Sequence, residues 1–189
     1  MNLDLGSIAS TLLGSSSLNG IANSTGVSKK DVTQVLSSAL PLLLQGAGKQ
    51  STGKSTAASF AQALEQHAGS STSSLSSFFK NVDLDDGAKI VSHLLGKSTN
   101  STTKSISKQT GLDANQVAAI LAAAAPLIMS LLGKSTTKVK KTDKTSSTQD
   151  LAKALIGNVD VNSILKGILK WWLAHLKMGF LLIDKVLPK

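Results

Sequence analysis

The segment Asp83–Gly87, with the sequence Asp-Leu-Asp-Asp-Gly, gathers carboxylates in a pattern that suggests calcium binding. An EF-hand loop needs oxygen ligands at alternating positions, a glycine at the sixth position and a bidentate Glu at the twelfth. Here the glycine comes one position early, and Leu94 stands where the Glu belongs. We therefore expect these carboxylates to cap the following helix and complement its dipole, and we predict no metal site.

Other residues with catalytic potential are few and scattered. The three histidines, His67, His93 and His175, have no second His or carboxylate four residues on, so no local metal pair forms. The chain has no Cys, its only Glu is Glu65, and it contains no Gly-x-Ser-x-Gly nucleophile elbow. The glycines of residues 46–49 lack the spacing of a phosphate-binding loop. The sequence thus predicts no enzyme and no cofactor.

Residues 21–32 resemble the helix-turn-helix motif of DNA-binding proteins, with a short helix, a turn at Gly26 and a second helix. The candidate nucleic-acid contacts are basic and polar residues of this second helix and of a basic linker: Lys29, Lys30, Gln34, Lys138, Lys140 and Lys141. The matching face of a second copy, residues 113–119, is neutral to acidic and apolar. We favour a plain αα-hairpin with a glycine turn, because short motifs often match by chance.

The C-terminal segment, residues 163–187, has a broad apolar surface and a narrow polar face formed by Lys166, Lys170, Lys177 and Asp184. This profile is typical of a helix that packs in the core or on a partner subunit, and also of an interfacial membrane helix. We favour the core or interface helix. Candidate residues for self-association or membrane contact are large and apolar: Trp171, Trp172, Leu176, Phe180 and Ile183.

The charge balance points to anionic partners, but only weakly. The formal net charge is +9 and the pI is about 9.8. All 20 basic residues are Lys, and aromatic residues make up 3% of the chain. The chain therefore lacks the guanidinium fork that reads bases and has few rings for stacking. It shows no secretory signal, and its longest uncharged apolar run, Val117–Leu132, is shorter than the roughly 20 residues of a membrane span. We expect a soluble, cytoplasmic protein.

The chain repeats itself at an offset of 85 residues. Between residues 21–49 and residues 106–134, ten of 29 positions are identical. The identical pairs are Ile21/Ile106, Thr25/Thr110, Gly26/Gly111, Val32/Val117, Leu36/Leu121, Ala39/Ala124, Pro41/Pro126, Leu42/Leu127, Gly48/Gly133 and Lys49/Lys134. Apolar residues recur at helical spacing, and no segment alternates as a strand does. The predicted fold is all-α, a helical bundle of tandem duplicated helix-turn-helix-like units.

Turn and cap residues predict the helix boundaries. Gly26 and Gly111 should end short helices, and Ser28 should open a longer helix with Asp31 completing a near capping box. Gly14 and Gly96 should end helices in the left-handed conformation, and Asp113 should cap the helix that follows it. We also expect a kink or break at Pro41 and a buried Ala-rich helix over residues 115–132.

The predicted organisation has four parts. A first helical repeat covers residues 1–80 and a second covers residues 81–133. A Lys/Ser/Thr-rich flexible linker follows over residues 134–147. Residues 148–189 form a partial third repeat that ends in the amphipathic Trp-rich helix.

The order of these motifs resembles a YidB-like bacterial domain of unknown function. The residues that carry the resemblance are Leu12-Leu13-Gly14, Thr25-Gly26, Ala39-Leu40-Pro41, Asp86-Gly87, Leu94-Leu95-Gly96, Thr110-Gly111 and Ala125-Pro126. It covers residues 1–133 well and residues 148–170 more loosely, and the Trp-rich end after Lys170 departs from the short Gly/Leu-rich ending expected of the family. The resemblance implies an all-α bundle and a bacterial host, and it transfers no catalytic residue.

Three functions remain open at this point. The first is a non-enzymatic structural or interaction module that forms a homo-oligomer, since repeated units that cannot bury their apolar faces alone tend to stack on neighbours. The second is a DNA-binding or nucleoid-associated protein, which would use the hairpin and the basic linker. The third is peripheral attachment to a membrane through the C-terminal helix. No small-molecule substrate is evident.

Overall fold

The computed structural model describes residues 5–142 of the 189-residue chain. Over this range the chain is helical, with no strand, which confirms the predicted all-α class. The elements in order are α1 (Leu5–Leu12), α2 (Ser15–Thr25), α3 (Lys29–Thr52), α4 (Ala57–Ala68), α5 (Leu75–Lys80), α6 (Leu84–Leu95), the 3₁₀ helix η1 (Gly96–Ser98), α7 (Thr99–Thr110) and α8 (Ala114–Thr142).

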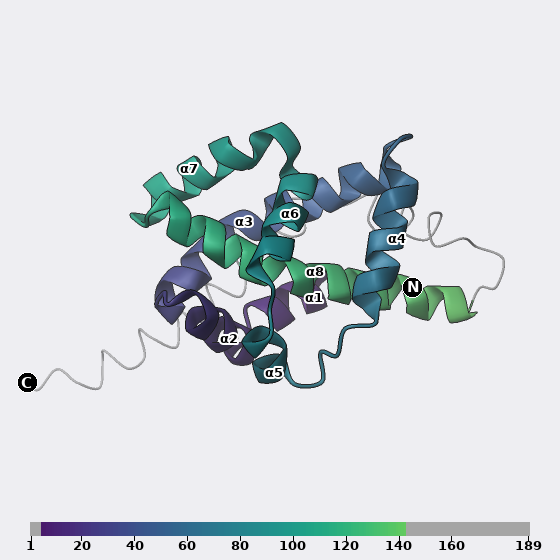
Figure 1. Cartoon of the computed structure of the whole chain (residues 1–189), viewed down its shortest axis with the longest axis horizontal. Coiled ribbons are helices and arrows are strands. Elements are labelled where there is room, and N and C mark those ends of the chain that lie inside the picture. The colour runs from purple at the N-terminus through teal and green to yellow at the C-terminus, as the bar shows by residue number, and fades with distance from the viewer. Residues whose placement is uncertain (1–4, 143–189) are drawn as a thin grey trace, which may run out of the picture.

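Helix α8 is the axis of the bundle. It runs along the long direction of the molecule, and α4 and α6 cross it steeply (Figure 1). Helices α1, α2, α3 and α7 also contact α8, while α5 packs on α2. This position follows from its sequence, because residues 120–130 are apolar or small on every face and all are buried.

The described helices share one hydrophobic core. Buried residues from the first predicted repeat, such as Leu40 and Phe60, belong to the same cluster as Leu121 and Ile128 from the second. The two predicted repeats, residues 1–80 and 81–133, therefore do not have separate cores. Residues 114–136 of α8 would be long and apolar enough to cross a membrane, but 78% of their most apolar window is buried inside this fold.

The two predicted hairpins, α2–α3 and α7–α8, turn in the same way. Gly26 and Gly111 both have positive φ, 70° and 74°, as predicted. The hydroxyl of Thr25 donates to the carbonyl of Ile21, and that of Thr110 donates to the carbonyl of Ile106. These shared details agree with a duplication, which remains a hypothesis.

Two predicted helix caps are confirmed. The Ser28 hydroxyl accepts a hydrogen bond from the Asp31 N–H and donates one to the Asp31 carboxylate. The Asp83 carboxylate accepts bonds from the N–H groups of Asp85 and Asp86, at 2.9 and 3.0 Å. The acidic cluster thus caps α6, in the manner of an N-cap residue.

Two other cap predictions need correction. Before α8, the Gln116 side chain accepts from the Asp113 N–H, which is the reverse half of a capping box; no bond to the Asp113 carboxylate is found in the described range. Gly14 is extended rather than left-handed, with φ −68° and ψ 150°, because it serves as the N-cap residue of α2. Gly96 after α6 has the positive φ expected of such an end, 56°, but its ψ of −132° is not that of a left-handed helical residue.

Helix lengths also depart from prediction. Pro41 lies inside α3 without splitting it, and Pro126 lies inside α8 in the same way. Both prolines are buried, so packing outweighs the lost backbone hydrogen bond, which costs roughly 3 kcal/mol. The expected flexible linker, residues 134–147, is wrong at its start because α8 continues to Thr142. Residues 143–147 lie outside the described range.

Glycines bring three pairs of helices into backbone contact. A Cβ at Gly87 of α6 would overlap the carbonyl oxygen of Ala122 in α8, the oxygen that Pro126 leaves without its usual helical donor. Gly46 of α3 meets the Leu94 carbonyl of α6 in the same way, and Gly133 of α8 meets the Leu64 carbonyl of α4. The crossings of α4 and α6 over α8 therefore depend on the absence of a side chain.

Candidate functional site

A polar groove of about 1050 Å³ lies between α2 and α5. Its floor is set by Gly20 and Phe79: Gly20 has no Cβ, and the Phe79 ring fills the space that one would occupy. Phe79 is 2% exposed and packs edge-on to Phe78, with ring centroids 5.3 Å apart. The contact between Phe79 and Gly20 holds the six-residue α5 against α2 and fixes the width of the groove.

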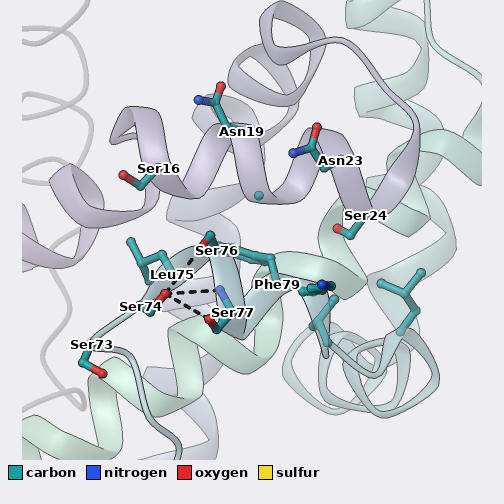
Figure 2. A pocket seen from close by; sticks show the side chains of 14 residues that line it. Ser16, Asn19, Asn23, Ser24, Ser73, Ser74, Leu75, Ser76, Ser77 and Phe79 are labelled. Atoms are coloured by element: carbon teal, nitrogen blue, oxygen red, sulfur yellow. Dashed lines mark hydrogen bonds between the residues drawn. The ribbon is translucent and has the colours of Figure 1, made fainter.

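The walls of the groove carry mostly uncharged polar groups (Figure 2). On α2 these are Ser16, Asn19, Asn23 and Ser24, which lie on one side of the helix because of their spacing. The other wall contains Ser73, Ser74, Ser76, Ser77 and the single charged residue, Lys80. The Ser74 hydroxyl caps α5 by accepting from the Ser77 N–H, and it also bonds to the hydroxyl of Ser77.

A second hollow, of about 420 Å³, brings His67 and Asp86 together beside a serine-rich loop. The His67 Nε2 atom lies 4.0 Å from the Asp86 Oδ2 atom. His67 comes from the end of α4 and Asp86 from the first turn of α6, so no local spacing in the sequence indicates the pair. Ser70, Ser71, Ser74 and Ser77 line the same hollow.

These groups do not form a nucleophile relay in the described structure. A relay needs a hydroxyl within hydrogen-bonding reach of the histidine and a carboxylate bonded to its other nitrogen. The hydroxyls of Ser71 and Ser74 bond instead to Ser73 and to Ser76 and Ser77. Among the described residues, no group of three or more His, Asp or Glu side chains could hold a metal ion.

The predicted nucleic-acid contacts are only partly placed. Lys29, Lys30 and Gln34 are exposed in the first two turns of α3, directly after the Gly26 turn. The structure therefore brings these three together on the surface, with Asp31 half-buried in the same turn. Lys138, Lys140 and Lys141 belong to the last part of α8, where side chains are not described. The self-association candidates Trp171, Trp172, Leu176, Phe180 and Ile183 lie outside the described residues.

The groove itself was not predicted. Residues 69–74 form the loop between α4 and α5. Asn19 and Asn23 gave a detectable signal, because their spacing of four places two amides on one side of a helix. What the sequence did not show is that α5 would dock beside them, since this depends on the contact of Phe79 with Gly20.

Comparison with known proteins gives a family but no function. No curated protein and no solved structure matches the chain. A family model described as "Bacterial protein of unknown function (DUF937)" matches residues 9–135, which include α2 to α7 and most of α8. The match covers both hairpins and the groove, and it agrees with the resemblance found in the sequence. The chain therefore belongs to the DUF937 family of bacterial proteins of unknown function.

Proposed function

We propose that the protein is a non-enzymatic interaction module that associates with copies of itself. The observation that supports this most directly is the chemistry of the α2–α5 groove and of the hollow beside His67 and Asp86. Both are rich in hydroxyls and amides that can bind, and neither unites a nucleophile, a base and an orienting acid by hydrogen bonds. Such surfaces suit recognition better than catalysis.

The exposed face of α3 offers a surface for self-association. Leu42 is 38% exposed and is the only large hydrophobic residue so exposed among those described. Its counterpart at the offset of 85, Leu127, is fully buried in α8, where other helices cover it. The same position is thus an interior contact in one hairpin and a surface residue in the other. We infer that a second copy covers Leu42.

A two-fold pairing of α3 helices fits this face. In an antiparallel arrangement centred on Leu42, Lys49 of one copy would lie opposite Val35 of the other, so the Lys49 side chains of the two copies would not oppose each other. Two-fold interfaces use the same patch on both subunits, and Leu42 would then meet Leu42. The apolar segment of residues 163–187 provides a second candidate surface by its sequence.

The test is the mass of the full chain in solution, measured by light scattering behind a sizing column in moderate salt. We expect a discrete dimer or larger assembly, which Leu42→Glu should convert to monomer because it places like charges at the contact. The control, Gln62→Glu, changes charge by the same amount on the exposed side of α4. A monomeric wild-type chain at all concentrations would refute self-association. If Leu42→Glu left the assembly unchanged, we would place the contact in residues 163–187 instead. The double variant Trp171→Ala/Trp172→Ala would then test that location.

DNA binding is the second candidate, favoured by the exposure of Lys29, Lys30 and Gln34 after the Gly26 turn. None of these side chains has an ion-pair partner in the described part of the chain. Phosphate contacts release counterions, so duplex binding through them should weaken steeply as salt rises. Binding that is independent of salt would exclude this candidate. Membrane attachment through residues 163–187 is a third reading, and equal flotation of wild type and Trp171→Ala/Trp172→Ala with liposomes would exclude it.

A further inference from the structure

A line of lysines runs along the outer side of α7. Lys104 and Lys108 are four residues apart on this helix, and Lys97 lies in η1 directly before it. All three lysines are exposed, whereas Ile106, the only large apolar residue of α7, is 2% exposed and belongs to the core. Residues four apart share one side of a helix, and a residue two positions away points to the other side. Lys97, Lys104 and Lys108, which we call the lysine stripe, thus face away from the core.

No nearby carboxylate offsets the charge of the lysine stripe. Helices η1 and α7 contain neither Asp nor Glu, and within the described part of the chain no ion pair joins the stripe to a carboxylate, Asp113 included. The acidic cluster Asp83–Asp86 begins α6, whose 12 residues separate it from η1 by about 18 Å. Salt screens exposed charges beyond about 8 Å at physiological ionic strength. The stripe therefore presents uncompensated positive charge at the outer edge of the bundle, where α7 lies (Figure 1).

The corresponding helix of the first hairpin, α2, lacks this charge. At the offset of 85, Lys104 matches Asn19 and Lys108 matches Asn23. Both asparagines are exposed, and their side chains point away from α5 (Figure 2). The same side of the two helices thus faces outwards, with an uncharged residue in one and a lysine in the other. Packing of the helix does not require the lysines, so their charge is available for a partner.

The residues around the lysine stripe favour phosphate groups of a nucleic acid over a lipid surface. Asn100 and Ser105 are exposed beside the stripe, and amide and hydroxyl side chains are frequent donors to phosphate oxygens. An interfacial membrane helix needs large apolar side chains that enter the bilayer, and α7 keeps its one such residue, Ile106, in the core. The chain has no Arg, so the guanidinium fork that reads base edges is missing.

We propose that the lysine stripe of α7 binds the phosphate backbone of duplex nucleic acid without sequence preference. From Lys97 to Lys108 the stripe is about 16 Å long, and phosphates of one strand follow each other every 3.4 Å or so along the duplex, so each lysine can reach a phosphate of its own. This inference goes beyond the proposed self-association. It also differs from the DNA-binding candidate above, because it uses the first helix of the second hairpin and other lysines.

The test is a titration of a fluorescently labelled mixed-sequence DNA duplex with the full chain, followed by anisotropy between about 50 and 200 mM salt. We expect wild type to bind with an affinity that falls as salt rises. Lys104→Asn/Lys108→Asn, which copies the residues of α2, should weaken binding at least about tenfold and reduce the slope of log affinity against log salt by about two. The control, Lys54→Asn/Lys80→Asn, removes the same charge from the α3–α4 loop and the end of α5, away from α7 (Figure 1), and should weaken binding much less.

Circular dichroism would verify that the double variant retains its helices. If it does not fold, Lys104→Gln/Lys108→Gln removes the same charges with a residue that favours helix. Absence of duplex binding, or equal weakening by the control, would overturn the proposal. So would a loss confined to Lys29→Gln/Lys30→Gln, since the first hairpin would then make the contact.

A lipid partner gives a different result. Flotation with anionic vesicles that depends on Lys104 and Lys108, without duplex binding, would overturn the proposal in favour of a membrane surface. Light scattering of the same samples reports the assembly state separately. Failure of duplex binding and failure of self-association are therefore distinguishable.

Discussion

At the scale of single residues, Gly87 lies where the backbones of α6 and α8 meet without a side chain between them. We predict that Gly87→Ala destabilises the protein by about 1–3 kcal/mol, the usual cost of overpacking a tight interface. Alanine is favoured over glycine in a helix by about 1 kcal/mol, so a helix-propensity argument alone predicts the opposite sign. The added Cβ would overlap the Ala122 carbonyl, which is backbone and cannot rotate away. Urea unfolding followed by circular dichroism measures the difference.

Gly69→Ala is the matched control for this substitution. Gly69 has a φ of −70°, which any residue adopts, and the nearest atom to a new Cβ is the Gln66 carbonyl oxygen at 3.6 Å. Its stability should stay the same or rise by up to about 1 kcal/mol, because alanine restricts the unfolded chain. If Gly87→Ala behaved like Gly69→Ala, α6 could move away from α8 at little cost, and the proposed role of close backbone contact would be wrong.

At the scale of elements, the two hairpins should respond alike to the loss of their turn glycines. A Cβ at Gly26 or Gly111 meets no atom within 4 Å, so the cost of alanine comes only from the left-handed backbone, about 1–2 kcal/mol at each. We predict equal costs that add in the double variant, measured by urea unfolding. Asparagine tolerates this conformation better and should cost less at both positions. Costs that differ strongly between the two sites would argue against equivalent hairpins.

The sequence predicted helix ends correctly where the cap or turn involves residues within one helical turn of each other. Gly26, Gly111 and the Ser28 and Asp83 caps all behave as their residue types indicate, because each contact joins neighbours in sequence. The same reasoning was wrong where tertiary packing decides the outcome. Pro41 does not break α3, the second of the two outcomes expected there, and α8 extends ten residues past Leu132 to Thr142, through the Lys-rich stretch. Burial overrides a weak local preference in the first case.

At the scale of the whole molecule, the sites depend on contacts that no local pattern encodes. The His67–Asp86 pair joins α4 to α6, and the groove exists because Phe79 docks on Gly20, 59 residues earlier in the chain. The sequence correctly predicted an all-α bundle with a central Ala-rich helix, since periodicity and composition determine both. It could not indicate which helices would cross α8. The crossings depend on contacts between a glycine of one helix and a backbone carbonyl of another, as at Gly87 and Gly133, and these residues are far apart in the sequence.

The shared core leads to a prediction about the unfolding of the entire molecule. Because both hairpins and α4 bury residues in one cluster, thermal unfolding should be a single transition whose calorimetric and van't Hoff enthalpies agree. Gly87→Ala should shift this transition without splitting it.

If copies associate through α3, the transition temperature of wild type should rise with protein concentration, since association stabilises only the folded state. Leu42→Glu should remove that dependence while keeping one transition, because Leu42 is exposed and lies outside the core cluster. Two separate transitions, one for α1–α5 and one for α6–α8, would show that the halves fold independently. The backbone contacts of Gly46 with Leu94 and of Gly133 with Leu64 argue against that result, since each joins a helix of one half to a helix of the other.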